Sequence, residues 1–126
     1  MYEATVEVSF AAAHNLRNYE GKCARLHGHN FRVQVTAESE ELDAVGMVID
    51  FTILKGLVRE LLEELDHSYL NEIPPFDKIN PTTEAVARYL WERVSAGVRE
   101  RTPGRRVRIA RVWVQETDAN SAAFRE

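Results

Sequence analysis

The segment from Cys23 to His29, here called the Cys/His box, carries the residue types best suited to chemistry in this chain. A thiol, Cys23, is followed after three residues by the imidazoles His27 and His29, just before a strand-like run. Successive side chains of an extended chain point to opposite faces, so these two histidines point the same way and can share one ion. A third imidazole, His14, ends the preceding strand-like run. Three of the four histidines are therefore predicted to form a metal site.

Three neutral imidazoles suit a Zn²⁺ ion, and a fourth position left open is typical of a catalytic site. Two roles for Cys23 stay open from the residues alone. As a fourth ligand, the thiol would close a structural zinc site. As a free thiol near the ion, it would be activated as a base or nucleophile. The flanking charges of Lys22 and Arg25 argue against a buried apolar role.

Two further segments carry groups that could meet a substrate. Asp66 and His67 follow a predicted helix, where they form either a proton relay or a favourable terminal charge. In the relay, Asp66 would orient His67, which would exchange protons with Cys23 or the substrate. Thr82 and Thr83 are most simply the start of a second helix, although exposed N–H groups there can also contact a ligand.

Glu116 ends a β-branched run over residues 105–117. Alternation divides this run into two faces, with Val107, Ile109 and Trp113 on one and Val112, Val114 and Glu116 on the other. A glutamate at a strand end usually faces solvent. It could instead anchor a heterocycle by accepting two hydrogen bonds from an amidine-like edge. Both interpretations stay open at this point.

The elements that must position these groups follow from hydrophobic periodicity. His27 and His29 share the parity of Phe31 and Val33, so the imidazoles extend an apolar strand face, and Thr52 is expected to cap the first helix. The predicted elements are, in order, strands 2–11 and 31–38, a helix over 53–65, a second helix and strands 105–117 and about 121–126. The second helix is capped by Thr82 or Thr83 and has its buried stripe over 86–98. This order predicts one α+β domain over residues 1–126, a four-stranded antiparallel sheet with two antiparallel helices on one face.

Composition narrows the class of protein. The 126 residues are 44% hydrophobic and 29% charged, which is ordinary for a soluble globular domain. No apolar run suits a membrane span, the N-terminus lacks signal-peptide features, and the single cysteine favours a reducing compartment, so we expect a cytoplasmic protein. A net charge of -4 argues against general nucleic-acid binding. Open sheet edges favour a homo-oligomer.

Six segments, taken together and in order, resemble the 6-pyruvoyl-tetrahydropterin synthase superfamily, and within it the 6-carboxy-5,6,7,8-tetrahydropterin synthases of queuosine biosynthesis. They are Phe10–His14, the Cys/His box, Val48–Phe51, Leu65–His67, Asn80–Glu84 and Val114–Thr117. Three residues separate Cys23 from His27, as in the carboxy-forming enzymes, whereas the pyruvoyl-forming enzymes usually have five. The resemblance covers nearly the whole chain.

The resemblance implies the tunnelling fold, in which trimers close their sheets into a barrel and two trimers stack into a hexamer with interfacial active sites. It implies that zinc is held by His14, His27 and His29 and that Cys23 is a catalytic proton carrier. Asp66 and His67 would be the relay, contributed by an adjacent subunit. Glu116 would bind the guanidine-like edge of the pterin, with Thr82 and Thr83 nearby.

The implied reaction converts 7,8-dihydroneopterin triphosphate to 6-carboxy-5,6,7,8-tetrahydropterin, acetaldehyde and triphosphate without nicotinamide or flavin. No motif fixes the triphosphate contacts, for which Arg17, Lys22 and Arg25 are candidates. Three rival interpretations are a 6-pyruvoyl-tetrahydropterin synthase, a non-catalytic zinc-stabilised interaction domain, and an arginine-rich nucleic-acid module.

Overall fold

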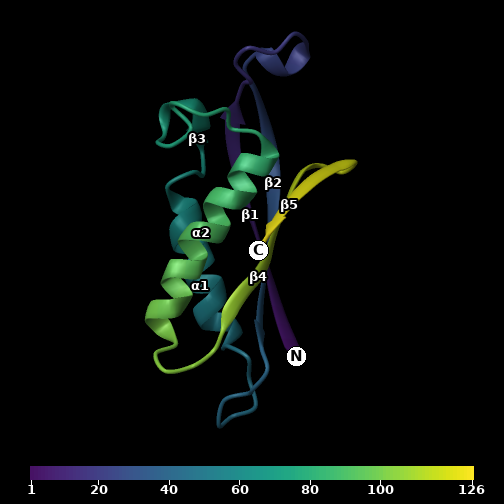
Figure 1. Cartoon of the computed structure of the whole chain (residues 1–126). Helices are drawn as coiled ribbons and strands as arrows, with labels where there is room; N and C mark the ends of the chain where they lie inside the picture. The colour runs from purple at the N-terminus through teal and green to yellow at the C-terminus, as the bar shows by residue number, and fades with distance from the viewer.

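The computed structural model describes all residues, 1–126, as one sheet with two helices on one side (Figure 1). The sheet has five strands in the order β3-β1-β2-β4-β5. The elements are β1 (Tyr2–His14), β2 (His27–Ser39), α1 (Phe51–Glu63), β3 (Ser68–Tyr69), α2 (Thr83–Arg101), β4 (Arg108–Thr117) and β5 (Asn120–Arg125), with short 3₁₀ turns at Lys22–Ala24 and Leu70–Glu72.

The α+β class and the two helices agree with the sequence, but the prediction of four strands was wrong. The fifth strand, β3, pairs in parallel with β1 through only two residues, Ser68 and Tyr69. A pairing this short leaves no periodic pattern to detect. It forms because the backbone of Ala11 is bonded to the preceding segment, its carbonyl accepting from His67 N–H at 2.6 Å and its N–H donating to Asp66 Oδ1 at 2.9 Å.

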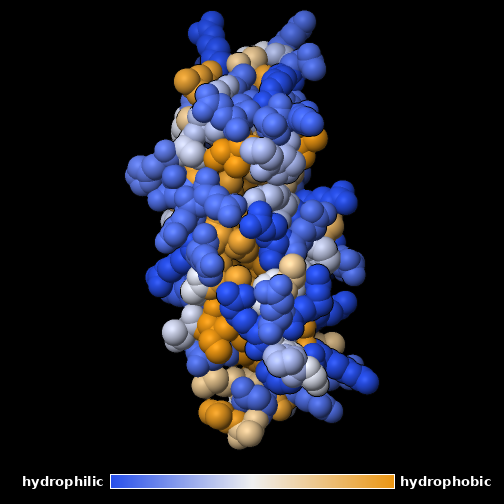
Figure 2. Space-filling view, turned by 90° about the vertical axis from the view of Figure 1, so that its left-hand side faces the viewer, coloured by the Kyte–Doolittle hydropathy of each residue, from blue (hydrophilic) through white to orange (hydrophobic).

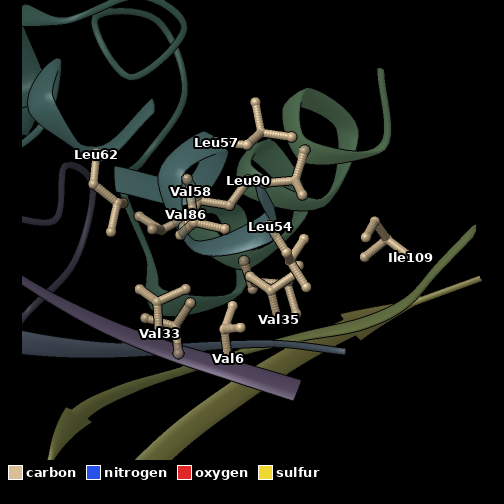
Figure 3. Close-up of a cluster of buried hydrophobic side chains, with 14 of the residues drawn as sticks. Val6, Val33, Val35, Leu54, Leu57, Val58, Leu62, Val86, Leu90 and Ile109 are labelled. Carbon is tan, nitrogen blue, oxygen red and sulfur yellow. The ribbon is translucent and has the colours of Figure 1, made fainter. Parts of the chain in front are cut away.

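The core lies between the sheet and the two helices (Figure 3). Val6, Val33 and Val35 of the sheet face Leu54 and Leu90 of the helices, and all five side chains are buried. The two helices approach closely at Gly97, where an added Cβ would lie only 2.7 Å from the δ-carbons of Leu57. The outward side of the helices is mainly hydrophilic, with apolar groups showing in a band along its middle (Figure 2). Neither helix has both the length and the apolar composition that a bilayer span needs.

The starts of the two helices differ in how well the sequence predicts them. Thr82 caps α2, its hydroxyl accepting from Ala85 N–H at 3.1 Å, as expected. The cap of α1 is Asp50 rather than Thr52, because the Asp50 carboxylate accepts the Thr52 N–H at 2.8 Å. A carboxylate two residues upstream satisfies the free donors of the first turn before the threonine can. The helix also ends at Glu63, two residues before the predicted end.

A β-bulge in β4 changes which residues face the helices. The pairing of β2 with β4 shifts where Thr36 faces Arg111 and Ala37 faces Ile109, which leaves Ala110 as an extra residue. Burial accordingly passes from Ile109 to Val112 and Val114 on the same side of the sheet. The prediction that Ile109 lies on the face opposite Val112, Val114 and Glu116 was therefore wrong. The bulge brings Ile109 to the same side as these residues, whose predicted grouping holds.

Candidate metal centre and active site

The sheet brings three histidines together at one end. β1 and β2 pair so that His14 faces His27 directly, and Ala12 faces His29. The ring centroids of the three imidazoles lie between 4.5 and 5.2 Å apart. The Phe31 ring packs edge-on against His14 and His29, so the cluster continues the apolar core. This is the arrangement that strand parity predicts.

Hydrogen bonds fix how two of these rings face the cluster. His14 Nδ1 donates to the Pro81 carbonyl oxygen at 2.8 Å, and His27 Nδ1 donates to the Arg25 carbonyl oxygen at 2.7 Å. A carbonyl can only accept, so in each neutral ring the proton is on Nδ1 and Nε2 keeps its lone pair. A backbone carbonyl on the second ring nitrogen is typical of metal-binding histidines, because it sets the tautomer and the ring orientation.

Glu116 lies within the histidine cluster. The candidate ligand atoms of His14, His27, His29 and Glu116 all lie within 4.8 Å of one another. Glu116 Oε1 is 3.1 Å from His14 Nε2 and 3.0 Å from His29 Nε2. By distance and angle, neither of these buried nitrogens forms a hydrogen bond. Sequence reasoning offered Glu116 either a solvent-facing or a heterocycle-binding role and missed this contact, because the pairing of β2 with β4 leaves no signal in either strand's own pattern.

The arrangement fits a divalent cation. Burial lowers the pKa of His29, although the nearby Glu116 carboxylate opposes the shift, so the imidazole is kept in its neutral, metal-binding form. The His14 Nε2 lone pair faces the Glu116 carboxylate, and the two repel each other unless a positive charge lies between them. Imidazole and carboxylate donors suit borderline metals such as Zn²⁺. The residues present therefore fit the ion that the sequence predicts.

Cys23 is outside this cluster of ligand atoms. It is half-buried in the 3₁₀ turn Lys22–Ala24, between the ends of β1 and β2. Its carbonyl oxygen accepts from Leu16 N–H at 2.8 Å, which closes the loop. The turn therefore places the thiol next to the segment that carries His27, as a separate group.

Asp66 and His67 are in contact at the edge of the sheet. Asp66 Oδ2 lies 2.9 Å from His67 Nδ1, and the His67 side chain is 82% exposed. The pKa of Asp66 is lowered, first by the hydrogen bond from Ala11 N–H and then by His67. His67 has a φ of 56°, a left-handed conformation that few residues other than glycine adopt. His67 and His29 both line one shallow surface depression of about 530 Å³.

The remaining candidate substrate contacts differ in whether their side chains are already engaged within the fold. The Thr82 hydroxyl is used in capping α2, and Thr83 is buried directly after it. The Arg17 guanidinium donates to three backbone carbonyls, those of Asn71, Phe76 and Ile79. It therefore holds a loop together, and the structure does not favour it as a triphosphate contact. Lys22 and Arg25 remain exposed.

Comparison with known proteins agrees with this geometry. Residues 3–126 match the family model described as 6-pyruvoyl tetrahydropterin synthase. The chain belongs to this family. A Synechocystis member named 6-carboxy-5,6,7,8-tetrahydropterin synthase is 44% identical over 124 residues, which cover 94% of this chain and 88% of that protein. The resemblance recognised in the sequence is therefore confirmed.

Two pyruvoyl-named proteins are also similar to this chain, one compared in sequence and one in structure. The human 6-pyruvoyl tetrahydrobiopterin synthase is 33% identical over 137 residues, which cover 94% of this chain and 87% of that protein. The structure of the Caenorhabditis elegans 6-pyruvoyl tetrahydropterin synthase superposes with a TM-score of 0.83 at 28% identity, covering 100% of this chain and 97% of that one. A pyruvoyl-named structure thus shares this fold, and both carboxy- and pyruvoyl-named relatives align in sequence with most of this chain.

Proposed function

We propose that this protein is a zinc-dependent 6-carboxy-5,6,7,8-tetrahydropterin synthase of queuosine biosynthesis. It would convert 7,8-dihydroneopterin triphosphate and one water to 6-carboxytetrahydropterin, acetaldehyde and triphosphate, and so act as a carbon–carbon lyase. The observation that carries the proposal is the group of three imidazoles whose nitrogens share one site beside Glu116. The 44% identity to a relative with this name and the spacing of Cys23 from His27 support the carboxy-forming reaction.

His14, His27 and His29 would hold the zinc, and the carbonyls of Pro81 and Arg25 would keep two of the rings in place. When bound, zinc would act as a Lewis acid that polarises substrate oxygens. Glu116 enters the same space from β4. Its carboxylate can accept hydrogen bonds from the amino and ring N–H groups of a pterin, so it would hold the ring beside the histidines.

Proton transfer would be the task of Cys23, Asp66 and His67. The Cys23 thiolate would take a proton from the substrate side chain and return it. Asp66 accepts from His67 Nδ1, so His67 Nε2 is left as the exposed, proton-accepting atom. In the oligomer, Asp66 and His67 would serve the site of an adjacent subunit, and Thr82 and Thr83 would lie near the substrate. Each chain would be one cytoplasmic domain of a homohexamer.

A 6-pyruvoyl-tetrahydropterin synthase is the alternative, because the human relative of that name is 33% identical over most of the chain. The two reactions differ in whether the substrate side chain is kept or cleaved. Incubating the zinc-loaded protein with 7,8-dihydroneopterin triphosphate and identifying the products by mass spectrometry separates them. We expect the carboxylated pterin together with acetaldehyde. A pterin that keeps its three-carbon side chain would establish the alternative, and no turnover would contradict both.

Two variants test the assigned roles in the same assay. Cys23→Ala should abolish turnover while zinc stays bound, whereas a zinc-stabilised interaction domain with Cys23 as a ligand predicts loss of metal. Glu116→Ala should keep zinc but weaken pterin binding by about tenfold or more, the value of a charged hydrogen bond. Unchanged pterin affinity would show that Glu116 does not anchor the ring.

A further inference from the structure

The turn that carries Cys23 is attached to the fold by the residues that follow His14. Leu16 N–H donates to the Cys23 carbonyl oxygen at 2.8 Å. The Asn15 side-chain Nδ2 donates to the Ala24 carbonyl oxygen at 3.3 Å. One bond is made by the backbone, so it can form with any residue other than proline at position 16. The other depends on an asparagine side chain.

The Asn15 side chain is held on its other side. The Tyr69 hydroxyl donates to Asn15 Oδ1, so both ends of the amide are engaged. The buried Asn71 side chain also binds the Asn15 backbone, accepting from its N–H at 3.0 Å and donating to its carbonyl oxygen at 2.9 Å. Because every polar group of Asn15 has a partner, its amide is held in one orientation.

These bonds join two parts of the candidate site. Tyr69 is in β3, two residues after His67, while Ala24 directly follows Cys23. We propose that Asn15 is a positioning residue for the Cys23 thiol, held in place by Tyr69 and Asn71; this rests on the proposed function of Cys23. Proton transfer needs the donor and acceptor within hydrogen-bond reach, so a turn released from its anchor would transfer protons poorly.

A general role in loop stability is the competing explanation, and the chain offers a matched control for it. The Asn80 side chain binds the backbone of Arg17 as the Asn71 side chain binds that of Asn15. It accepts from the Arg17 N–H at 2.8 Å and donates to the Arg17 carbonyl oxygen at 2.9 Å. It has no hydrogen bond to the turn Lys22–Ala24. Asn80→Ala therefore removes comparable bonds from the same loop without removing the anchor of Cys23.

The test compares Asn15→Ala and Tyr69→Phe with Asn80→Ala and with Tyr2→Phe at an exposed tyrosine. Cys23 is the only cysteine, so its alkylation by iodoacetamide reports on one thiol. Both test variants should be alkylated about tenfold faster and have a kcat about tenfold lower, with KM within about twofold and metal content unchanged. Asn80→Ala should lower the melting temperature and leave the alkylation rate as in the wild type.

A wild-type alkylation rate in Tyr69→Phe, or an equal acceleration in Asn80→Ala, would overturn the proposal. Tyr69→Phe removes one hydroxyl, so it decides the question if Asn15→Ala fails to fold. Alkylation needs no substrate. If the wild type has no turnover, the proposed function is refuted. If the variants are still alkylated at the expected relative rates, the positioning of the thiol holds independently.

Discussion

At the scale of single residues, several side chains of the site use one polar atom in a hydrogen bond to the backbone and keep the other for the site. His14 and His27 each give their Nδ1 proton to a carbonyl oxygen, and Asp66 takes the Ala11 N–H. Backbone partners orient these groups without charge of their own. The Nε2 atoms of the two histidines are thereby left for other partners, and Asp66 Oδ2 is left for His67 Nδ1.

Comparing replacements of His27 and His67 should separate metal binding from proton transfer. His27→Ala leaves two imidazoles, so we expect loss of zinc and of activity together, measured by elemental analysis of the dialysed protein. His67→Ala is the matched control, because this exposed ring is outside the cluster of ligand atoms. It should keep its zinc and lose turnover by about a hundredfold. An active, metal-free His27→Ala would contradict the proposed ligand set.

Because the pKa of Asp66 is lowered in the folded protein, the free energy of unfolding depends on pH in the acid range. The folded protein holds this carboxyl deprotonated below its ordinary pKa of 3.8, so the unfolded chain binds more protons there. The stabilisation is present above that value and is lost as the pH falls through the lowered, folded-state pKa. Urea unfolding of the wild type and of Asp66→Asn should show midpoints that converge from about pH 6 to about pH 3. A difference that stays constant would mean that the carboxylate charge contributes nothing.

At the scale of elements, regular periodicity was predictable and its interruptions were not. Strand parity correctly predicted that His14, His27 and His29 would converge, because both strands run without a break. The sequence did not reveal the bulge at Ala110, because alanine is tolerated on either face of a strand. Nor did it reveal β3, which depends on bonds to Ala11 rather than on a pattern of its own. The missed features are those set by tertiary contacts.

The contact between the two helices gives opposite expectations at two glycines. A Cβ at Gly97 would meet Leu57, whereas a Cβ at Gly56 has nothing within 4 Å. Gly97→Ala should be the less favourable substitution, since overpacking costs about 1–3 kcal/mol. Gly56→Ala should stabilise by about 0.5–1 kcal/mol, because alanine favours a helix. Guanidinium unfolding of both variants measures the difference, and equal midpoints would show that Leu57 yields to the added methyl.

At the scale of the whole molecule, the sheet ends in unpaired edges. β5 has one neighbour, and β3 covers β1 only at Ala12 and Ala13. Free N–H and C=O groups along a strand favour pairing with another chain. The proposed hexamer would cover both edges. It would also bring Asp66 and His67, which lie at the β1 edge, against a neighbouring subunit.

Assembly and activity should therefore depend on the same contact between subunits, in which the β5 edge of one chain would meet the β1 edge of the next. Sedimentation of the purified protein should give about six chain masses if trimers stack in pairs, as the family resemblance implies. Replacing Ala123 of β5 by proline blocks a strand edge, so this variant should sediment as smaller species and lose turnover. Its zinc content should not change, because His14, His27 and His29 come from one chain. A fully active monomer would contradict interfacial active sites.

The bulge in β4 has a consequence for how this chain tolerates a change of length. Seven positions separate Ile109 from Glu116, and in a regular strand an odd separation puts two side chains on opposite faces. The extra residue Ala110 brings both side chains to the helix side. A single-codon deletion at position 110 would restore regular alternation and leave Glu116 facing the histidines. Unbroken pairing would then hold the carboxylate where the bulged strand now holds it.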